Sequence, residues 1–466
     1  MEPPGDPARR TPRALLGMAV VLLALLMSAP GPAAAAGPEP QATFTAPEDG
    51  ATGVSPTTSL TWNTIPEAQN VFITIGTSTG ANDVLASGEL PGDSTSYEIP
   101  VALPRGVPLH VRIYTKVAGA YDRYEDITFT AEPFPSGSLP APHAEGTRIV
   151  AGGRTLKLRG VNRDSLTWGR HNWSGCGGDQ HFTDRDFDEM QAWGFNAVRI
   201  PLSQANWLGR RCDAGDDARM VDSAVQKANE RGMYAIVDLH WSDVGGRSPC
   251  DADCNTGQQP MPDADSLDFW RQVAQRYEDR SGVIFDLYNE PHDVSWSCWR
   301  DGGCTTESSE YANGGKQVDY RVVGLQQLAD AVRGEGAGNL VLAAGLDWAW
   351  DLRGVVDGHA LDDPNVAYDT HVYTLFHHTQ DDWDEHVGVA ADEVPVTATE
   401  FGSSDCSTAD TRRLLDWFDD EGIGWSIWSW NDPGSCQQPS VLANMEGTPL
   451  AGQGQLIHDR LAAEGR

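Results

Sequence analysis

The C-terminal two thirds of the chain alternates short apolar runs with longer segments that carry an apolar residue every three or four positions. Stripes at i, i+3, i+4 and i+7 predict helices that include Val221, Trp270 and Leu325, and Thr183 is expected to cap a further helix. The eight apolar runs predict strands at residues 156–161, 197–200, 233–240, 283–289, 340–344, 366–371, 394–400 and 424–428. Eight such repeats over residues 148–466 favour a (β/α)₈ barrel. The alternative, an open doubly wound sheet, normally carries a glycine-rich turn after its first strand, and this chain has none there.

Residues 41–131 follow a different pattern of short alternating segments that are separated by turn residues. This pattern predicts a small antiparallel β-sandwich, with Trp62 in its core. The expected strands are 59–62, 70–75, 96–99, 109–114 and 126–130. Residues 132–147 are rich in proline and are expected to form a semi-stiff linker.

Residues 1–36 have the order of a secretory signal peptide: arginines, an apolar run from Ala14 to Met27, then small residues. An uncleaved anchor is the alternative. We therefore expect a secreted, extracellular protein that has no membrane association after signal cleavage. All eight cysteines lie in the C-terminal two thirds, where an exported chain is expected to form disulfides. The expected local pairs are Cys250 with Cys254 and Cys298 with Cys304; a zinc site would need a second Cys or His pair at metal spacing.

The formal net charge is -34, and the chain has four lysines. Such an acidic surface repels nucleic acid and anionic lipid. It is compatible with a neutral polymer as the partner, although solubility outside the cell explains the charge equally well. We expect a monomer that needs no cofactor and no metal ion.

Two glutamates end predicted barrel strands. Glu290 follows the run at 283–289 and stands in the string Asn289-Glu290-Pro291, and Glu400 ends the run at 394–400. Hydrolysis of a glycosidic bond requires two carboxyl groups that face each other across the bond. Strict alternation would aim Asn289 and Glu290 at opposite faces, so we expect the backbone to leave regular strand geometry there, as at a bulge.

Other polar and aromatic side chains gather at the same predicted strand ends. Barrel enzymes place their chemistry at the C-terminal ends of the strands, so these side chains are expected to surround one pocket. They are Arg199, His240, Asn289, His371, Tyr373 and Trp428.

With the two glutamates, these residues resemble the eight positions that shape the cleavage subsite in glycoside hydrolase family 5, and the resemblance covers residues 148–462. It implies a retaining double displacement with Glu290 as acid/base and Glu400 as nucleophile. Burial and the charge of Glu400 are expected to keep Glu290 protonated. The resemblance further implies that Arg199 and Tyr373 hold Glu400, that Asn289 binds the sugar 2-hydroxyl, that His240 and His371 bind hydroxyls or orient the acids, and that Trp428 is a stacking floor.

The expected substrate is a β-glycan, with endo attack on β-1,4-glucan as the first hypothesis. β-Mannanase or another family 5 specificity is the runner-up, because Arg163 and Asp164 stand where endoglucanases of the family often carry an aromatic residue. A catalytically silent carbohydrate-binding protein is the alternative from another class. Asn162, Trp241 and Trp430 are further candidates for sugar subsites, and Trp430 suits the core equally well.

Tryptophans also occupy the loops that follow the predicted strands, where they either stack on sugars or pack the loops. They are Trp168, Trp173, Trp207, Trp241, Trp296, Trp299, Trp348 and Trp350. Residues 258–262 predict a shaped loop over the cleft to which the sequence assigns no role. Residues 41–131 resemble the fibronectin type III-like and immunoglobulin-like modules of exported carbohydrate enzymes, which implies a spacer or a sugar-binding module.

Overall fold

The computed structural model describes the sandwich segment, the barrel segment and part of what joins them. The described residues are 40–54, 58–82, 84–99, 103, 108–131, 139–166, 183–209, 214–243, 258–309, 317–377, 379–403, 408–432, 435–436 and 439–464. The predicted signal peptide, Trp168, Trp173 and the pair Cys250/Cys254 lie outside them. The expected linker is described only from residue 139, and its last part forms strand β9 (His143–Glu145).

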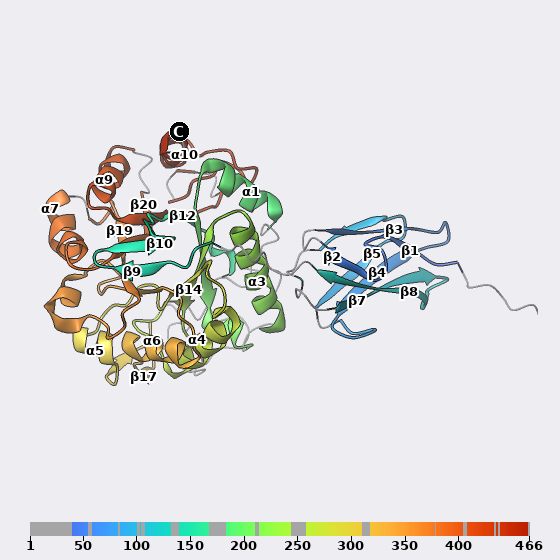
Figure 1. Ribbon diagram of the computed structural model, residues 1–466, viewed down its shortest axis with the longest axis horizontal. Helices are drawn as coiled ribbons and strands as arrows, with labels where there is room; N and C mark the ends of the chain where they lie inside the picture. Colours follow the sequence, from blue (N-terminus) through green and yellow to red (C-terminus); the bar gives the residue numbers. More distant parts are fainter. Residues whose placement is uncertain are drawn as a thin grey trace, which may run out of the picture. The chain divides into compact units, whose positions relative to one another are not determined.

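Eight parallel strands close into a barrel, which confirms the predicted (β/α)₈ fold (Figure 1). Each strand pairs with the next, and β21 pairs back with β12. The strands are β12 (Arg159–Asn162), β13 (Ala197–Ser203), β14 (Tyr234–Trp241), β15 (Val283–Asp286), β18 (Val341–Ala344), β19 (Val366–Tyr373), β20 (Val396–Gly402) and β21 (Gly424–Ile427).

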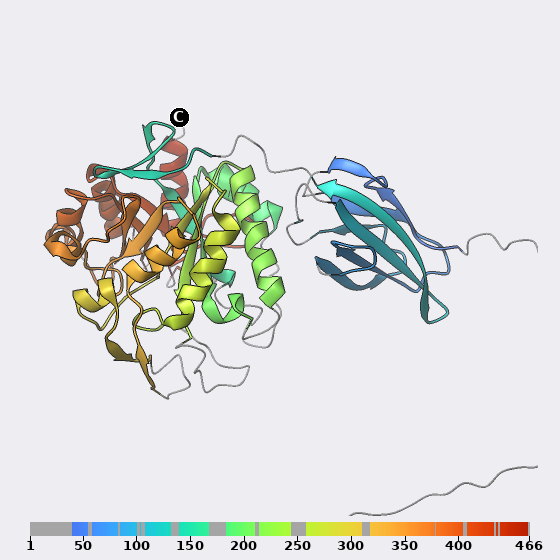
Figure 2. The same ribbon diagram turned by 60° about the horizontal axis from the view of Figure 1, so that its bottom comes forward.

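Helices surround the barrel, as two views show (Figures 1 and 2). Val221, Trp270 and Leu325 of the predicted stripes are fully buried, and the Thr183 side chain accepts a hydrogen bond from the Asp186 amide, as expected of a cap. The α-helices are α1 (Asp184–Trp193), α2 (Gln204–Trp207), α3 (Ala214–Glu230), α4 (Ala264–Tyr277), α5 (Trp296–Asp301), α6 (Leu325–Gly334), α7 (Gln380–Trp383), α8 (Val389–Ala391), α9 (Ala409–Asp420) and α10 (Gln453–Glu464). Shorter elements are η1 (Asp164–Leu166), η2 (Val355–His359), η3 (Asp384–Gly388), β10 (Arg148–Ala151), β11 (Arg154–Thr155), β16 (Thr305–Glu307) and β17 (Asp319–Arg321).

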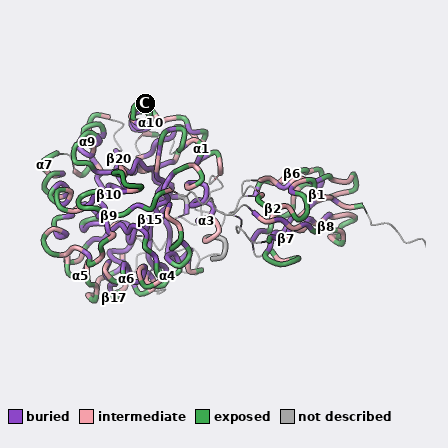
Figure 3. Tube along the Cα trace, in the orientation of Figure 1, coloured by how far each residue is buried: buried purple, intermediate pink, exposed green. Residues whose placement is uncertain are grey.

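The barrel strands are buried along almost their whole length (Figure 3). Irregular backbone occurs where the apolar runs give way to polar residues. The pairing of β13 with β14 skips His240, and the pairing of β19 with β20 skips Thr399. Strands β14 and β20 therefore each carry one extra residue at that point, as in a bulge. Strand β15 ends at Asp286, three residues before Asn289. The expected departure from alternation before Glu290 is therefore confirmed, although the strand simply ends there.

Residues 43–131 form two sheets. One sheet has the order β1-β3-β6, and the other has the order β2-β8-β7-β4-β5. Leu60 and Trp62 of the first sheet share one core with Val71 and Val111 of the second, so the two sheets pack as a sandwich. The strands are β1 (Thr43–Ala46), β2 (Ala51–Val54), β3 (Ser59–Asn63), β4 (Asn70–Gly76), β5 (Leu85–Pro91), β6 (Ser96–Glu98), β7 (Pro108–Val117) and β8 (Ala120–Ala131). The likeness to fibronectin or immunoglobulin modules stays a prediction.

One of the expected disulfides is present. Cys298 and Cys304 are bonded, with 5.8 Å between their Cα atoms. Within the described part of the chain, no helix combines the length and the apolar composition that a membrane span requires.

Candidate active site

A buried arginine stands at the centre of the barrel end where the predicted site residues meet. The Arg199 guanidinium on β13 donates from Nε to Asp286 Oδ2 at 2.8 Å and from Nη1 to Glu400 Oε1 at 2.6 Å, and Nη2 lies 3.0 Å from Asp238 Oδ2. Burial opposes the charge on Arg199, but the carboxyl groups of Asp238, Asp286, Glu400 and Asp369 outweigh it and raise its pKa well above the ordinary value. Burial raises the pKa of Asp286 well above its usual range, against the opposing effect of Arg199. The guanidinium is thus a permanent positive charge at the floor of the site.

Two amide side chains complete the contacts of this guanidinium. Nη1 donates to Asn162 Oδ1 at 3.1 Å, and Nη2 donates to Asn289 Oδ1 at 2.8 Å. Asn162 is fully buried, and its Nδ2 donates to the backbone oxygens of Thr399 and Ile427. Asn162 therefore orients Arg199 and does not face a sugar, which corrects the expectation of a subsite residue. The Nδ2 group of Asn289 donates to no described residue, so it is available to a ligand.

The Glu400 carboxylate is held on both oxygens. Arg199 donates to Oε1, and the Tyr373 hydroxyl donates to Oε2 at 2.7 Å. Burial, and next the charge of Glu400, raise the pKa of Tyr373 well above its ordinary value. The hydroxyl therefore keeps its proton and remains a donor to the carboxylate, as the sequence predicted.

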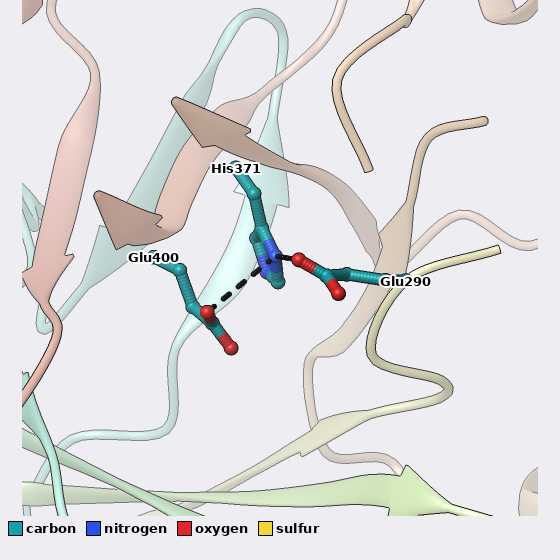
Figure 4. Close-up of side chains that lie close together, drawn as sticks. All are labelled: Glu290, His371 and Glu400. Carbon is teal, nitrogen blue, oxygen red and sulfur yellow. Dashed lines mark hydrogen bonds and ion pairs between the residues drawn. The ribbon is translucent and has the colours of Figure 1, made fainter. Parts of the chain in front are cut away.

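Glu290 faces Glu400 from the other side of His371 (Figure 4). His371 Nδ1 lies 2.8 Å from Glu290 Oε1 and 3.7 Å from Glu400 Oε2. On its other side, His371 Nε2 lies 3.2 Å from Thr399 Oγ1 and 3.3 Å from Asp369 Oδ2. His371 is fully enclosed, and it orients the acids rather than presenting an open ring to a sugar hydroxyl.

The distance between the two glutamates is short. A carboxylate oxygen of Glu290 and one of Glu400 lie within 4.8 Å of each other, together with a ring nitrogen of His371. Three such ligand atoms would also suit a metal ion by spacing alone. Both Glu400 oxygens, however, already accept strong hydrogen bonds from Arg199 and Tyr373, so the donors around the site account for the carboxylate without an ion.

The charges of this cluster interact strongly. Burial opposes a charge on His371, but Glu400 and Asp369 outweigh it and raise the pKa of His371 well above its usual value. Burial also works to raise the pKa of Glu290, but the hydrogen bond and charge of His371 outweigh it, and the net pKa is lowered. This direction is opposite to the sequence-based expectation for Glu290. The expectation omitted the hydrogen bonds from His371 and Gln258, which favour the ionised form of Glu290.

The comparisons with known proteins agree with this geometry. The model of the family Cellulase (glycosyl hydrolase family 5) matches residues 150–434, more than half of the 466 residues. The chain belongs to glycosyl hydrolase family 5. Among solved structures, the beta-glucanase SdGluc5_26A from Saccharophagus degradans has a TM-score of 0.55 at 22% identity, and the match covers 72% of this chain and 98% of that one. At this identity the likeness establishes the shared fold.

Curated relatives of this family 5 chain are distant. Endoglucanase A of Butyrivibrio fibrisolvens is 27% identical over 301 residues, which are 61% of this chain and 59% of that protein. Endoglucanase CelA of Streptomyces lividans is 24% identical over 327 residues, which are 67% of this chain and 61% of that protein. The chain thus spans less than two thirds of the length of either relative.

Aromatic residues of the family 5 site fall into two groups. Trp428 is half-buried and stacks beside His240, with 5.6 Å between ring centroids and 16° between planes. Trp430 is fully buried and meets Trp193 edge-on at 5.0 Å. Trp430 is therefore a core residue, and its subsite alternative is wrong. Trp241 is buried beside His240 and leaves little surface for a sugar.

The described tryptophans of the loops also differ in exposure, and Trp348 is the exposed one. Trp348 follows β18, is 47% exposed, and stacks on His292 with 3.7 Å between ring centroids. Asp347, Trp348 and Ala349 have positive φ angles of 54°, 63° and 62°. This conformation is costly for residues other than glycine. The Trp348 amide donates to the carbonyl of Pro291, next to Glu290. The buried loop tryptophans are Trp207, Trp241, Trp299 and Trp350, and Trp296 is half-buried.

Arg163 and Asp164, which made the substrate doubtful, are both buried. Arg163 Nη1 donates to Asn431 Oδ1 at 3.1 Å, and Asn431 Nδ2 donates to Asp164 Oδ1 at 2.7 Å. Asn431 also donates to the hydroxyl of Ser429, the residue after Trp428. These contacts hold in place the segment that carries Trp428.

Sequence reasoning missed the residues that support the site. Asp238, Asp286 and Asp369 are fully buried carboxylates in the middle of apolar strand runs. A buried charge requires a partner, so each acid within an apolar run was a readable signal of an internal network. Gln258 had no such signal. Its Nε2 donates to Glu290 Oε2 at 2.5 Å, which gives the loop at 258–262 a role at the site.

Proposed function

We propose that this protein is a secreted, retaining endo-β-1,4-glucanase that hydrolyses β-1,4-glucan by double displacement. The observation that carries the proposal is the approach of Glu290 and Glu400 oxygens to within 4.8 Å at one end of the barrel. Retaining glycosidases hold their carboxyl groups about 5–5.5 Å apart, whereas inverting enzymes leave about 6.5–9.5 Å for a water molecule. The short distance supports retention.

In the first step, Glu400 attacks the anomeric carbon while Glu290 protonates the departing glycosidic oxygen. This forms an ester bond between Glu400 and the sugar and breaks the glycosidic bond. In the second step, Glu290 takes a proton from water, the water oxygen attacks the anomeric carbon, and the ester breaks. Arg199 and Tyr373 aim Glu400 by holding both of its oxygens, and Asn289 offers its free amide group to the sugar.

The polymer specificity rests on the aromatic surfaces and on the relatives. Trp428 is half-buried, and its amide donates to the carbonyl of Phe401, the residue after Glu400. Trp348 is 47% exposed, and its amide donates to the carbonyl of Pro291, the residue after Glu290. An accessible tryptophan close in the chain contacts to each glutamate suits a substrate that extends beyond the cleaved bond, as endo attack requires. The relatives named above are endoglucanases, which favours β-1,4-glucan over β-mannan. The predicted signal peptide supports secretion.

Three variants of the full chain test the roles on an aryl β-cellobioside with a good leaving group. We expect Glu400→Gln to abolish turnover. Glu290→Gln should keep the first step, accumulate the glycosyl-enzyme, and release a β-glycosyl azide when azide replaces the missing base. Glu393→Gln changes an exposed glutamate and serves as the matched control. Equal loss in both site variants, or an α-anomer as the first product, would refute the assigned roles.

The substrate class is tested with soluble β-glucan, mannan and xylan. An endoglucanase lowers the viscosity of β-glucan well before reducing ends accumulate. If the protein hydrolyses only mannan, the proposed substrate is wrong and the proposed mechanism still stands. Undiminished polymer binding without turnover of any β-glycoside would favour the silent binding protein.

A further inference from the structure

The five-stranded sheet of the sandwich has an unusual outer face. Along β4 the residues alternate, with Val71 and Ile73 in the core and Phe72 on the other face. Strand pairing sets Phe72 opposite Tyr114 of β7, and Tyr114 opposite Tyr124 of β8. The three rings form one row across the sheet, with centroid distances of 6.0 Å and 5.9 Å. We call this row the aromatic strip.

A cavity of about 500 Å³ opens beside the aromatic strip, within the size range of small-ligand pockets. Its lining combines rings with groups that form hydrogen bonds: Phe72, Thr74, Gly80, Asn82, Glu89, Tyr114 and Tyr121. Thr74 is 4% exposed, and its Oγ1 has no hydrogen-bond partner among the described residues. A buried hydroxyl without a partner is costly, and a ligand in the cavity would supply the missing bond.

The charges on this face are already paired with one another. Arg112 Nε donates to Asp126 at 2.7 Å, and Lys116 Nζ lies 2.8 Å from Glu89. The Arg112 guanidinium also sits 3.9 Å from the centroid of the Tyr124 ring. Such a face offers many hydrogen-bonding atoms but little net charge, which suits a neutral polyhydroxylated ligand.

The ring orientations restrict the shape of that ligand. Phe72 and Tyr114 are tilted by 43°, and Tyr114 and Tyr124 by 55°. A flat crystal face of a polysaccharide requires coplanar rings, whereas a single chain can twist from ring to ring. The distance between rings is close to one sugar repeat of a β-glucan.

We propose that the aromatic strip and its cavity bind a single β-glucan chain, so that the sandwich is a carbohydrate-binding module and not a mere spacer. The apolar faces of successive sugars would stack on Phe72 and Tyr114 and contact the exposed part of Tyr124 that Arg112 leaves uncovered, and the sugar hydroxyls would bond to Thr74 and Glu89. The site is argued from the sandwich alone; the choice of β-glucan as the sugar rests on the proposed function.

The test measures binding by the full chain with Glu400→Gln in every protein, so that the ligand survives. Calorimetry with cellohexaose and affinity electrophoresis in soluble mixed-linkage β-glucan compare this background with Phe72→Ala/Tyr114→Ala and with Tyr124→Ala. Tyr124 is 46% exposed, so its removal does not open the core. Tyr97→Ala is the matched control, because Tyr97 lies on β6 of the other sheet.

We expect two binding sites per chain in the background protein and the loss of one, or at least tenfold weaker binding there, in the strip variants. Tyr97→Ala should leave both sites intact. Unchanged binding by Tyr124→Ala and by a folded double variant would overturn the proposal. So would a change in the mass of the strip variants by sedimentation, because the strip would then cover a second copy of the chain.

Turnover of an aryl β-cellobioside separates this inference from the proposed function. In a background with Glu400 intact, the strip variants should keep the kcat/KM of the wild type on this small substrate. A chain that hydrolyses no β-glucan yet loses a binding site in the strip variants would refute the proposed function and support the module. If the chain hydrolyses β-glucan and the strip variants bind normally, the proposed function is supported and the binding module is refuted.

Discussion

The hydrogen bond from Gln258 to Glu290 makes a prediction that tests the acid/base directly. Gln258 Nε2 donates to Glu290 Oε2 at 2.5 Å, and this donor helps to lower the pKa of the carboxyl group. Gln258→Met keeps a side chain of similar length and removes the donor. Gln258→Glu replaces the donor with a second carboxylate at the same place.

The magnitude follows from the chemistry of the contact. A hydrogen bond to a charged group is worth about 1.5–3 kcal/mol, and one pKa unit corresponds to about 1.36 kcal/mol. The Glu290 side chain is 16% exposed, so little solvent replaces the lost donor. Removal of the donor disfavours the ionised form by about 1.5–3 kcal/mol, so Gln258→Met should raise the pKa of Glu290. Gln258→Glu should raise it further through repulsion of like charges.

The assay is the pH profile of kcat/KM on an aryl β-cellobioside. Glu290 and His371 share one proton across their 2.8 Å contact, and the alkaline limb of kcat/KM marks the loss of that proton from the pair. Removal of the donor favours the form with the proton on Glu290, so the alkaline limb should move upward in the order Gln, Met, Glu. The acidic limb should stay in place, because Gln258 donates to Glu290 and not to Glu400. An alkaline limb that stays fixed or moves downward would show that Glu290 does not control this limb.

Three further predictions follow from the contacts of the barrel. Arg199→Met removes the ion-pair partner of Asp238 and Glu400 and should lower the free energy of unfolding by about 3–5 kcal/mol, measured by chemical denaturation. Tyr373→Phe removes one hydrogen bond to the nucleophile and should lower kcat/KM by roughly tenfold or more with unchanged stability, measured by steady-state kinetics and thermal unfolding. Replacement of Cys298 and Cys304 by serine opens a short loop and should cost about 2 kcal/mol, seen as a lower Tm than that of the wild type without reductant.

Periodicity predicted the barrel but not all of its strand ends. The run at 283–289 continues with Leu287 and Tyr288 after Asp286, yet the ladder of β15 stops at Asp286, because Leu287 and Tyr288 are buried without continuing the strand. Hydrophobicity reports burial and not pairing, so the two cannot be separated in such a run. Strand β5 was missed for the opposite reason: it is a largely exposed edge strand that contains Gly88, and its residues lack the apolar alternation of a half-buried strand.

The candidate site could be predicted where each residue stands at a strand end, and not where its role depends on partners distant in sequence. Asn162 and Trp430 look alike as residues that follow strands, but tertiary contacts place one behind Arg199 and the other in the core. Gln258 comes from a loop with no periodic pattern, so only the folded chain shows its contact with Glu290. The predicted direction of the Glu290 pKa shift was wrong for the same reason, because the shift depends on hydrogen bonds from His371 and Gln258.

A lowered pKa for Glu290 is compatible with its role as an acid once the protons are counted over the whole cluster. The directions of the two pKa shifts favour a charged His371 beside an ionised Glu290. With Glu400 acting as a carboxylate acceptor for Arg199 and Tyr373, the three residues then carry a net charge of minus one. Transfer of the proton across the 2.8 Å contact makes Glu290 the acid and leaves that sum unchanged. When Glu290 gives the proton to the leaving group, Glu400 becomes an ester and loses its charge, so the sum is still minus one.

The second step restores the starting state without a change in the net charge of the three residues. Glu290 takes a proton from water, Glu400 is released as a carboxylate, and the proton returns to His371. The cluster thus keeps one negative charge through both steps, facing a guanidinium on Arg199 that cannot change its own charge. A buried site in which the net charge is constant avoids the cost of creating or removing a charge away from water. Within the proposed mechanism, His371 has a function beyond orientation: it would hold the acid's proton while Glu290 is ionised.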